Sequence, residues 1–146
     1  MRALAISFIL SVLALPAWSA DPIVGSIKTV SGTATVRRGQ QTLSATTGMH
    51  LLPNDILQTG ADGRLGAILQ DGTGLGLGPG TELKIDTFLF EPADGKFGLL
   101  LRMARGVLAY FSGRIAKFAP GSVTLETPVG VIGLRGTHFA VSLGGA

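Results

Sequence analysis

The residues best suited to chemistry lie in a glycine-rich turn. In Asp71-Gly72-Thr73-Gly74, Gly72 separates the aspartate from the threonine, which breaks the Asp-Thr-Gly motif of aspartic proteases. A single copy would also supply only half of the carboxylate pair that this chemistry needs. An Asp-Gly pair is far more often the centre of a hairpin turn. The sequence therefore predicts a turn at Asp71 and no catalytic aspartate.

The run that follows, residues 74–80, alternates glycine with leucine before a Gly-Pro-Gly turn. A phosphate-binding loop would need a helix after it and a Gly-Lys-Ser/Thr sequence, and both are missing here. Alternating glycines on a strand favour close packing of neighbouring strands instead. We expect a short strand at Gly74–Leu77.

Neither a metal site nor an enzyme is indicated. His50 and His138 are far apart, and no His, Cys or carboxylate cluster surrounds either of them, as a zinc site would require. The aspartates do not follow a calcium-loop spacing, and no Gly-x-Ser-x-Gly elbow occurs. The aspartates that could in principle bind calcium are Asp55, Asp62, Asp71, Asp86 and Asp94. We expect a protein without catalytic residues, cofactor or metal.

One segment carries charge of a single sign. Residues 95–125 contain five basic side chains and no acidic one. One interpretation is a solvated face; the other is an interaction surface for an anionic partner, such as an acidic protein patch or an envelope polymer. The surface residues expected in the second case are Arg102, Arg105, Arg114 and Lys117, next to Lys96.

The elements that must position these residues are short strands. No convincing amphipathic helix appears after the leader, and alternation of apolar and polar residues recurs between turn signals about every ten residues. The expected strands are Ile23–Val30, Thr33–Arg38, Gln41–Ala45, Asp55–Thr59, Arg64–Gln70, Gly74–Leu77, Glu82–Asp86, Phe88–Glu91, Phe97–Met103, Gly106–Phe111, Arg114–Phe118 and Ser122–Glu126. The pattern fits an all-β domain, either a coiled, solenoid-like roll or a β-sandwich.

The last stretch, from Thr127 to Val141, predicts two further strands, Val129–Leu134 and Thr137–Ser142, hinged at Arg135-Gly136. Pro128 is expected at the start of a strand, because it lacks the N–H that a ladder needs. A guanidinium in so apolar a setting should be paired. We expect Arg135 to pair with Asp55, Asp71, Asp86 or Glu126, so that Arg135→Ala lowers thermal stability more than Arg105→Ala.

The first nineteen residues read as a cleaved Sec-type signal peptide, with Arg2 before an apolar run and small residues at Ala17 and Ser19. The run is shorter than the roughly twenty residues of a membrane span, so we expect no spanning segment after processing. Residues 20–146 then form one domain. Without Arg2 the chain has 11 basic and 9 acidic side chains, a net charge of +2, which does not suggest a nucleic-acid binder. The expected location is periplasmic or secreted.

Several motifs resemble those of FecR-type periplasmic domains. The terminal run TPVGVIGLRGTHFAV is similar to the signature of that family, in the positions Thr127, Pro128, Arg135, Gly136, Thr137 and Phe139. Upstream segments match in order and spacing, including Gly32–Val36, Asp55–Gly60, Asp62–Arg64, Asp71–Thr73, Leu77–Thr81 and Gly106–Leu108. The resemblance covers about residues 25–141.

What the resemblance implies is a small β-helical roll, which favours the solenoid-like arrangement, and a non-enzymatic sensing or protein-interaction module. Similar domains pass a signal from an outer-membrane receptor to a cytoplasmic sigma factor in iron uptake. We expect this chain to have no anti-sigma region before its apolar segment and no receptor-contacting domain after Val141. We therefore expect a binding role toward an envelope or outer-membrane protein; the alternative is a structural envelope scaffold.

Overall fold

The computed structural model describes residues 22–144, and within them the expected all-β class is confirmed. The predicted signal peptide, residues 1–19, lies outside the described residues. The strands are β1 (Gly25–Ser31), β2 (Ala34–Arg38), β3 (Gln41–Ser44), β4 (His50–Leu51), β5 (Ile56–Thr59), β6 (Arg64–Leu69), β7 (Gly74–Leu77), β8 (Glu82–Glu91), β9 (Lys96–Phe111), β10 (Val123–Thr127), β11 (Gly130–Gly133) and β12 (His138–Leu143). A 3-10 turn, η1 (Pro92–Asp94), joins β8 to β9, and a short helix, α1 (Arg114–Phe118), follows β9.

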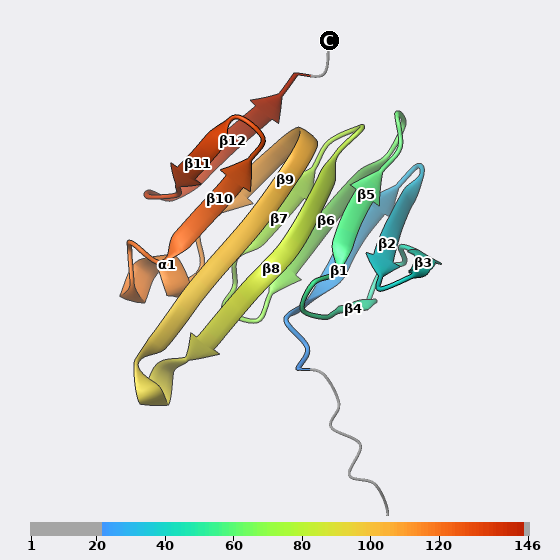
Figure 1. Ribbon diagram of the computed structural model, residues 1–146. Helices are drawn as coiled ribbons and strands as arrows, with labels where there is room; N and C mark the ends of the chain where they lie inside the picture. Colours follow the sequence, from blue (N-terminus) through green and yellow to red (C-terminus); the bar gives the residue numbers. More distant parts are fainter. Residues whose placement is uncertain (1–21, 145–146) are drawn as a thin grey trace, which may run out of the picture.

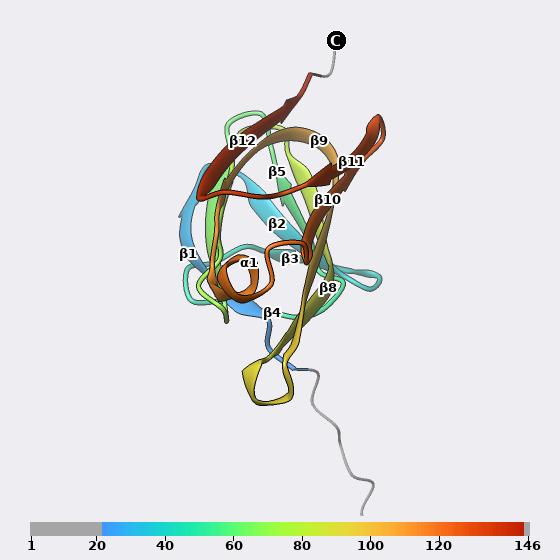
Figure 2. The ribbon, with the colours of Figure 1, turned by 90° about the vertical axis from the view of Figure 1, so that its left-hand side faces the viewer.

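The strands form one sheet that curls around a single core, as Figures 1 and 2 show. The order along the sheet is β3-β2-β5-β8-β9-β7-β6-β1-β4, and all of these neighbours pair antiparallel. On the open side, β10 pairs with β9 in parallel, β11 pairs with β10, and β12 pairs with β9. The rolled arrangement favoured by the sequence is present as this curled sheet.

The long strand β9 holds the two halves of the roll together. Its first part pairs with β8 and β10, and its second part pairs with β7 and β12. Between these parts Gly106 has a φ of +100°, and a Cβ there would lie 2.3 Å from Cα of Thr81. Only glycine fits such a bend without strain. The two strands predicted at Phe97–Met103 and Gly106–Phe111 are therefore one bent strand.

The core is built from the inward-facing residues of both halves. Burial alternates along β5, β6 and the first part of β8, as expected for strands with one face on a core. Each fully buried leucine contributes about 1.5–3 kcal/mol relative to an exposed one. Side chains with no exposed surface include Ile27, Leu57, Leu83, Leu101, Leu108 and Leu125.

The alternating glycines of β7 serve the close packing expected from the sequence. A Cβ on Gly74 would lie 3.2 Å from Cβ of Phe111, and a Cβ on Gly76 would lie 3.5 Å from Cβ of Ala109. The missing side chains thus leave room for residues of β9, the neighbouring strand. The strand prediction at Gly74–Leu77 is confirmed.

The strand predicted at Arg114–Phe118 is wrong, because this segment forms α1. The N–H of Arg114 donates to the carbonyl oxygen of Asp71 (2.9 Å), and the N–H of Ile115 donates to Oδ2 of the same residue (3.1 Å). Ile115 is fully buried beneath the helix. Five residues are too few to show a helical period in the sequence, and the acceptor lies more than forty positions upstream.

Candidate functional site

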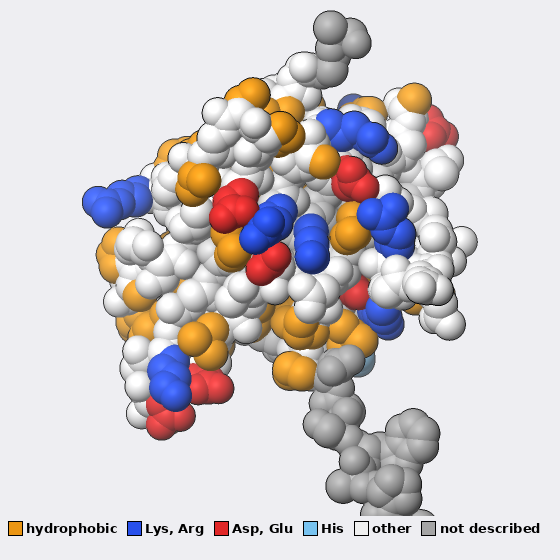
Figure 3. Space-filling view, in the orientation of Figure 1, with side chains coloured by type: hydrophobic (Ala, Val, Ile, Leu, Met, Phe, Trp, Pro, Cys, Tyr) orange, Lys and Arg blue, Asp and Glu red, His pale blue; other side chains and the backbone are white. Residues whose placement is uncertain are grey.

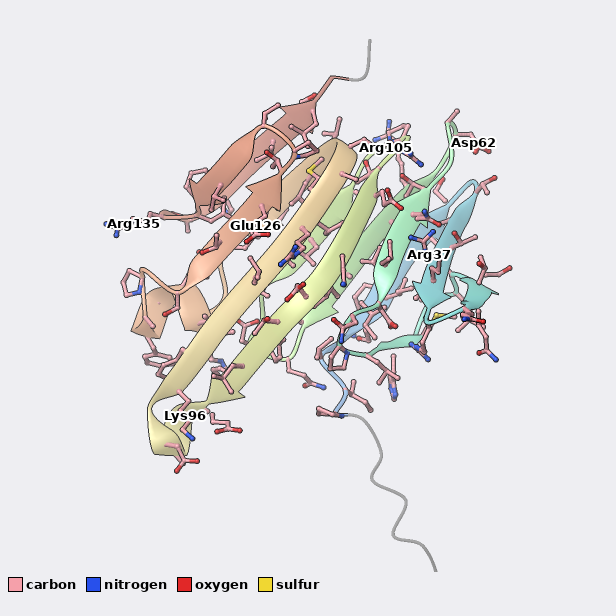
Figure 4. The ribbon with its side chains drawn as sticks, in the orientation of Figure 1. Arg37, Asp62, Lys96, Arg105, Glu126 and Arg135 are labelled. Atoms are coloured by element: carbon pink, nitrogen blue, oxygen red, sulfur yellow. The ribbon has the colours of Figure 1, made fainter. Side chains whose placement is uncertain are left out.

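The basic residues predicted to form one interaction surface do not lie together. Arg102 lies on the outer face of β9, where its Nε is 2.9 Å from Oδ2 of Asp86 and 3.3 Å from Oε2 of Glu126. Arg105 and Lys96 lie at opposite ends of the first part of β9 (Figure 4). The other two, Arg114 and Lys117, belong to α1.

Arg102 is part of an ion-pair network that crosses the outer face of β8, β9 and β10. Nζ of Lys84 lies 3.9 Å from Oδ2 of Asp86, the carboxylate that Arg102 also contacts. Figure 3 shows acidic and basic side chains alternating across the middle of this face. Exposed pairs of this kind contribute about 0–1 kcal/mol each. The positive charge of Arg102 is therefore compensated by the carboxylates of Asp86 and Glu126.

The expected burial and ion pairing of Arg135 are wrong. Arg135 is exposed in the segment between β11 and β12, and its side chain points away from the molecule (Figure 4). Of its four expected partners, Asp55 pairs with Arg38, whereas Asp86 and Glu126 pair with Arg102. The buried residue of this segment is Leu134. An apolar sequence surrounds Arg135, but the segment between β11 and β12 lies at the surface, where solvent reaches the guanidinium.

Thr127 and Pro128 form the tight turn between β10 and β11. The hydroxyl of Thr127 donates to the carbonyl of Gly130 (2.9 Å) and accepts from the N–H of Val129 (3.3 Å). Pro128 therefore lies in the turn and not, as predicted, at the start of a strand, which begins at Gly130. Pro128 has no backbone N–H to donate, and the turn does not need a donor at this position.

The remaining signature residues attach β12 to the roll. The N–H of Ser112 donates to the carbonyl of Thr137 (2.9 Å), which fixes the start of β12 against the end of β9. The ring of Phe139 packs on Tyr110, with centroids 6.3 Å apart. Gly136 has a φ of +110° and lies against the Phe139 ring. These residues build the closing segment of the fold.

Asp71 is buried, and both of its carboxylate oxygens accept hydrogen bonds. Oδ1 accepts from the N–H of Thr73 (3.0 Å), and Oδ2 accepts from the hydroxyl of Thr73 (2.8 Å) and the N–H of Ile115 (3.1 Å). Gly72 has a φ of +89°, as the predicted turn requires. Because these bonds reach both Thr73 and Ile115, Asp71 connects the β6–β7 turn to α1 and has a structural role.

The hydroxyl of Tyr110 lies in the same region and is fully buried. Among the described residues, no hydrogen bond of good geometry is made to this hydroxyl, although the side chain of Thr73 lies close enough to interact with it. Burial raises the pKa of Tyr110 from 10.0 to about 12, the negative charge of Asp71 adds to the rise, and the Thr73 side chain opposes it. A buried hydroxyl without a partner costs about 1–3 kcal/mol.

Replacement of Tyr110 by phenylalanine is therefore expected to raise the free energy of unfolding by about 1 kcal/mol at neutral pH, because it removes this cost.

The native protein should also lose stability as the pH rises from 10 to 12, since the unfolded chain gives up the tyrosine proton first. The loss would amount to roughly 2–3 kcal/mol over two pH units. Both effects are measured by urea unfolding of the native protein and of Tyr110→Phe between pH 8 and pH 12. If the free energy of unfolding fell by the same amount with pH in both proteins, the predicted loss of stability above pH 10 would be contradicted.

Two of the predicted surface residues and two of the signature residues meet in one hollow, which we call the α1 hollow. Its volume is about 620 Å³, and α1 lies at the open side of the roll, below the segment that joins β11 to β12 (Figure 2). The lining residues are Asp71, Ser112, Gly113, Arg114, Ala116, Lys117, Pro120, Gly136 and Thr137.

The second candidate site is the free edge of β11. This strand pairs with β10 on one side and, among the described strands, with none on the other. All four of its residues are exposed, and its sequence, Gly-Val-Ile-Gly, has no charge. Val129 in the adjoining turn is 86% exposed, Val131 is 67% exposed and Ile132 is 39% exposed. We call the strand with its turn the β11 edge.

The sequence predicts β11 as a strand but does not indicate that it is exposed. A short apolar run is typical of a buried strand, and burial depends on whether a further strand covers it. The one signal of exposure is the place of β11 in the sequence, because the β10–β11 hairpin follows the long strand β9. Lys28, which no motif in the sequence marks as a candidate, also lies in a hollow beside α1.

Comparison with known proteins identifies one family. A family model described as FecR protein matches residues 55–146, which is well over half of the chain. No curated protein and no solved structure matches this sequence. Among residues 22–144, the structure has no helix that is long and apolar enough to cross a membrane.

Proposed function

Because the chain belongs to the FecR family, an envelope-associated family of signalling and regulatory proteins, we propose that it is a protein-interaction module of the periplasm that takes part in sensing. The proposal includes its export by the leader at residues 1–19. It also includes a partner in the envelope or outer membrane, and a link to iron-uptake signalling is the most specific form of this role.

The observation that carries the proposal is the β11 edge. Natural sheets usually protect an edge strand with charge, proline or a short length, because a free row of N–H and C=O groups invites another strand. At the opposite side of the sheet, β3 is an edge with three polar residues, Gln41, Thr42 and Ser44. β11 is as short as β3 but has no such polar residue, and its exposed valine and isoleucine add an apolar contact surface.

A strand from a partner can bind such an edge by extending the sheet. The main-chain hydrogen bonds then supply affinity, and alternate side chains of the edge supply specificity. Val131 and Ile132 point to opposite faces of β11, because successive side chains on a strand alternate. A partner strand would therefore be held by an apolar contact on each face of the extended sheet.

Val131→Lys is expected to abolish this binding while leaving the fold intact. A lysine at an edge strand disfavours pairing with another strand, and Val131 is already exposed, so the free energy of unfolding should change by no more than about 0.5 kcal/mol. Affinity capture from envelope extract with purified residues 20–146, followed by mass spectrometry, compares the two proteins.

The matched control is Thr42→Lys, which places the same charge on the edge strand β3 at the other side of the sheet. We expect one protein to be retained in stoichiometric amount by the native chain and the Thr42 variant, and to be lost with the Val131 variant. Retention by all three would contradict the assignment of the β11 edge. Bulk association of all three with wall or membrane material would favour the structural scaffold instead.

A further inference from the structure

We propose that the end of the roll at α1 is a second binding site, which takes an acidic peptide segment in extended conformation. This inference is independent of the β11 edge. It concerns the α1 hollow and a smaller hollow next to it, of about 270 Å³, which is lined by Lys28, Ile68 and Leu69 among others. Arg114 lines both hollows. We call the two together the basic furrow.

Three cations face this furrow without a partner of opposite charge. In the described part of the chain, no carboxylate lies within ion-pair distance of Lys28, Arg114 or Lys117. Asp71 is the one acidic residue in the lining of either hollow, and its carboxylate is already held by Thr73 and Ile115. The furrow therefore has a net positive charge available to a ligand.

Arg114 is held in position before any ligand arrives. Its guanidinium carbon lies 5.9 Å from the centroid of the Phe90 ring, in a cation–π contact. Its backbone N–H is fixed by the carbonyl of Asp71. A restrained side chain loses less conformational entropy on binding than a free one, so Arg114 is the best placed of the three cations to receive a carboxylate.

The shape and lining of the furrow favour a peptide over a lipid surface. The α1 hollow is concave and lies within the range of about 300–1,000 Å³ typical of ligand pockets. Apolar groups such as Ala116, Pro120 and Ile68 lie beside the cations, and the hydroxyls of Ser112 and Thr137 are available for hydrogen bonds. An extended peptide presents carboxylates, apolar atoms and amides together, and its length suits two hollows that share one arginine.

The test is fluorescence anisotropy with a labelled hexaglutamate peptide, with hexaglutamine as the uncharged probe, at low ionic strength. The double variant Arg114→Gln/Lys117→Gln is expected to weaken hexaglutamate binding about tenfold, because it removes two of the three cations. Hexaglutamine should not bind. Rising salt should weaken the native interaction, since charges at the surface are screened.

The matched control is Arg64→Gln/Arg105→Gln, which removes the same charge from two exposed residues outside the furrow. Its affinity for hexaglutamate should stay within about twofold of the native value. Circular dichroism of both variants checks that they are folded. Equal weakening by the two variants, or no binding of hexaglutamate to the native protein, would overturn the proposal. Binding of dextran sulfate or of anionic phosphatidylglycerol vesicles with no binding of the peptide would overturn it as well.

Discussion

Asp71→Ala is expected to lower the free energy of unfolding by about 3–5 kcal/mol, the largest effect of any single substitution considered for this protein. The carboxylate is 1% exposed and accepts three hydrogen bonds from Thr73 and Ile115. Alanine would leave the donors of Thr73 and Ile115 buried without an acceptor, and α1 would lose its attachment to the β6–β7 turn. Urea unfolding at neutral pH measures the change.

Two comparisons make this prediction specific. Asp94→Ala removes a carboxylate from the exposed turn between β8 and β9 and should have almost no effect. Asp71→Asn retains one acceptor oxygen and should lie between the native protein and Asp71→Ala. If the alanine substitutions at positions 71 and 94 gave the same stability, Asp71 would not hold α1 in place.

Arg38→Ala is expected to cost about 3 kcal/mol, because it leaves a buried carboxylate without its cation. Asp55 has no exposed surface, and it accepts from Nε of Arg38 at 3.0 Å and from Nη2 at 2.8 Å. The same Nη2 donates to the carbonyl of His50 (3.0 Å), so the guanidinium links β2 to β4 as well. Such a bidentate pair is among the stronger polar contacts of proteins.

The control for Arg38 is Arg135→Ala. Arg135 is exposed, and its loss should change the free energy of unfolding by no more than about 0.5 kcal/mol. The stabilising role that the sequence leads us to expect of Arg135 is therefore assigned to Arg38. Melting temperatures of the two variants test this assignment, and a larger drop for Arg135→Ala than for Arg38→Ala would contradict it.

Local patterns in the sequence are sufficient to predict most of the strands. Ala34–Arg38, Arg64–Leu69 and Gly74–Leu77 lie within one residue of their predicted ranges. In each of them alternation or glycine spacing is bounded by a turn residue, so the local signal and the final fold agree. β8 and β9 were each predicted as two strands, because a bulge near Asp86 and the bend at Gly106 interrupt the alternation without ending the strand.

Long-range contacts explain what the sequence could not predict. Arg38 and Asp55 are seventeen positions apart, and nothing local connects them. α1 depends on an acceptor forty-four positions away. Arg135 illustrates the reverse case, in which apolar neighbours indicate burial but the segment between β11 and β12 lies at the surface. The exposure of Val131 and the meeting of Arg114, Lys117 and Thr137 at one hollow likewise depend on the roll as a whole.

The proposed function depends on the β11 edge being the docking strand for a protein partner. Amide hydrogen exchange, measured on the free protein and on the complex retained by affinity capture, tests it most directly. We predict that the amides of β11 that point away from β10, which are those of Val131 and Gly133 by the register of the pair, exchange rapidly in the free protein and become protected in the complex, while those of β3 do not change. Protection confined to β3 or to another surface, with β11 still exchanging rapidly in the complex, would contradict the claim.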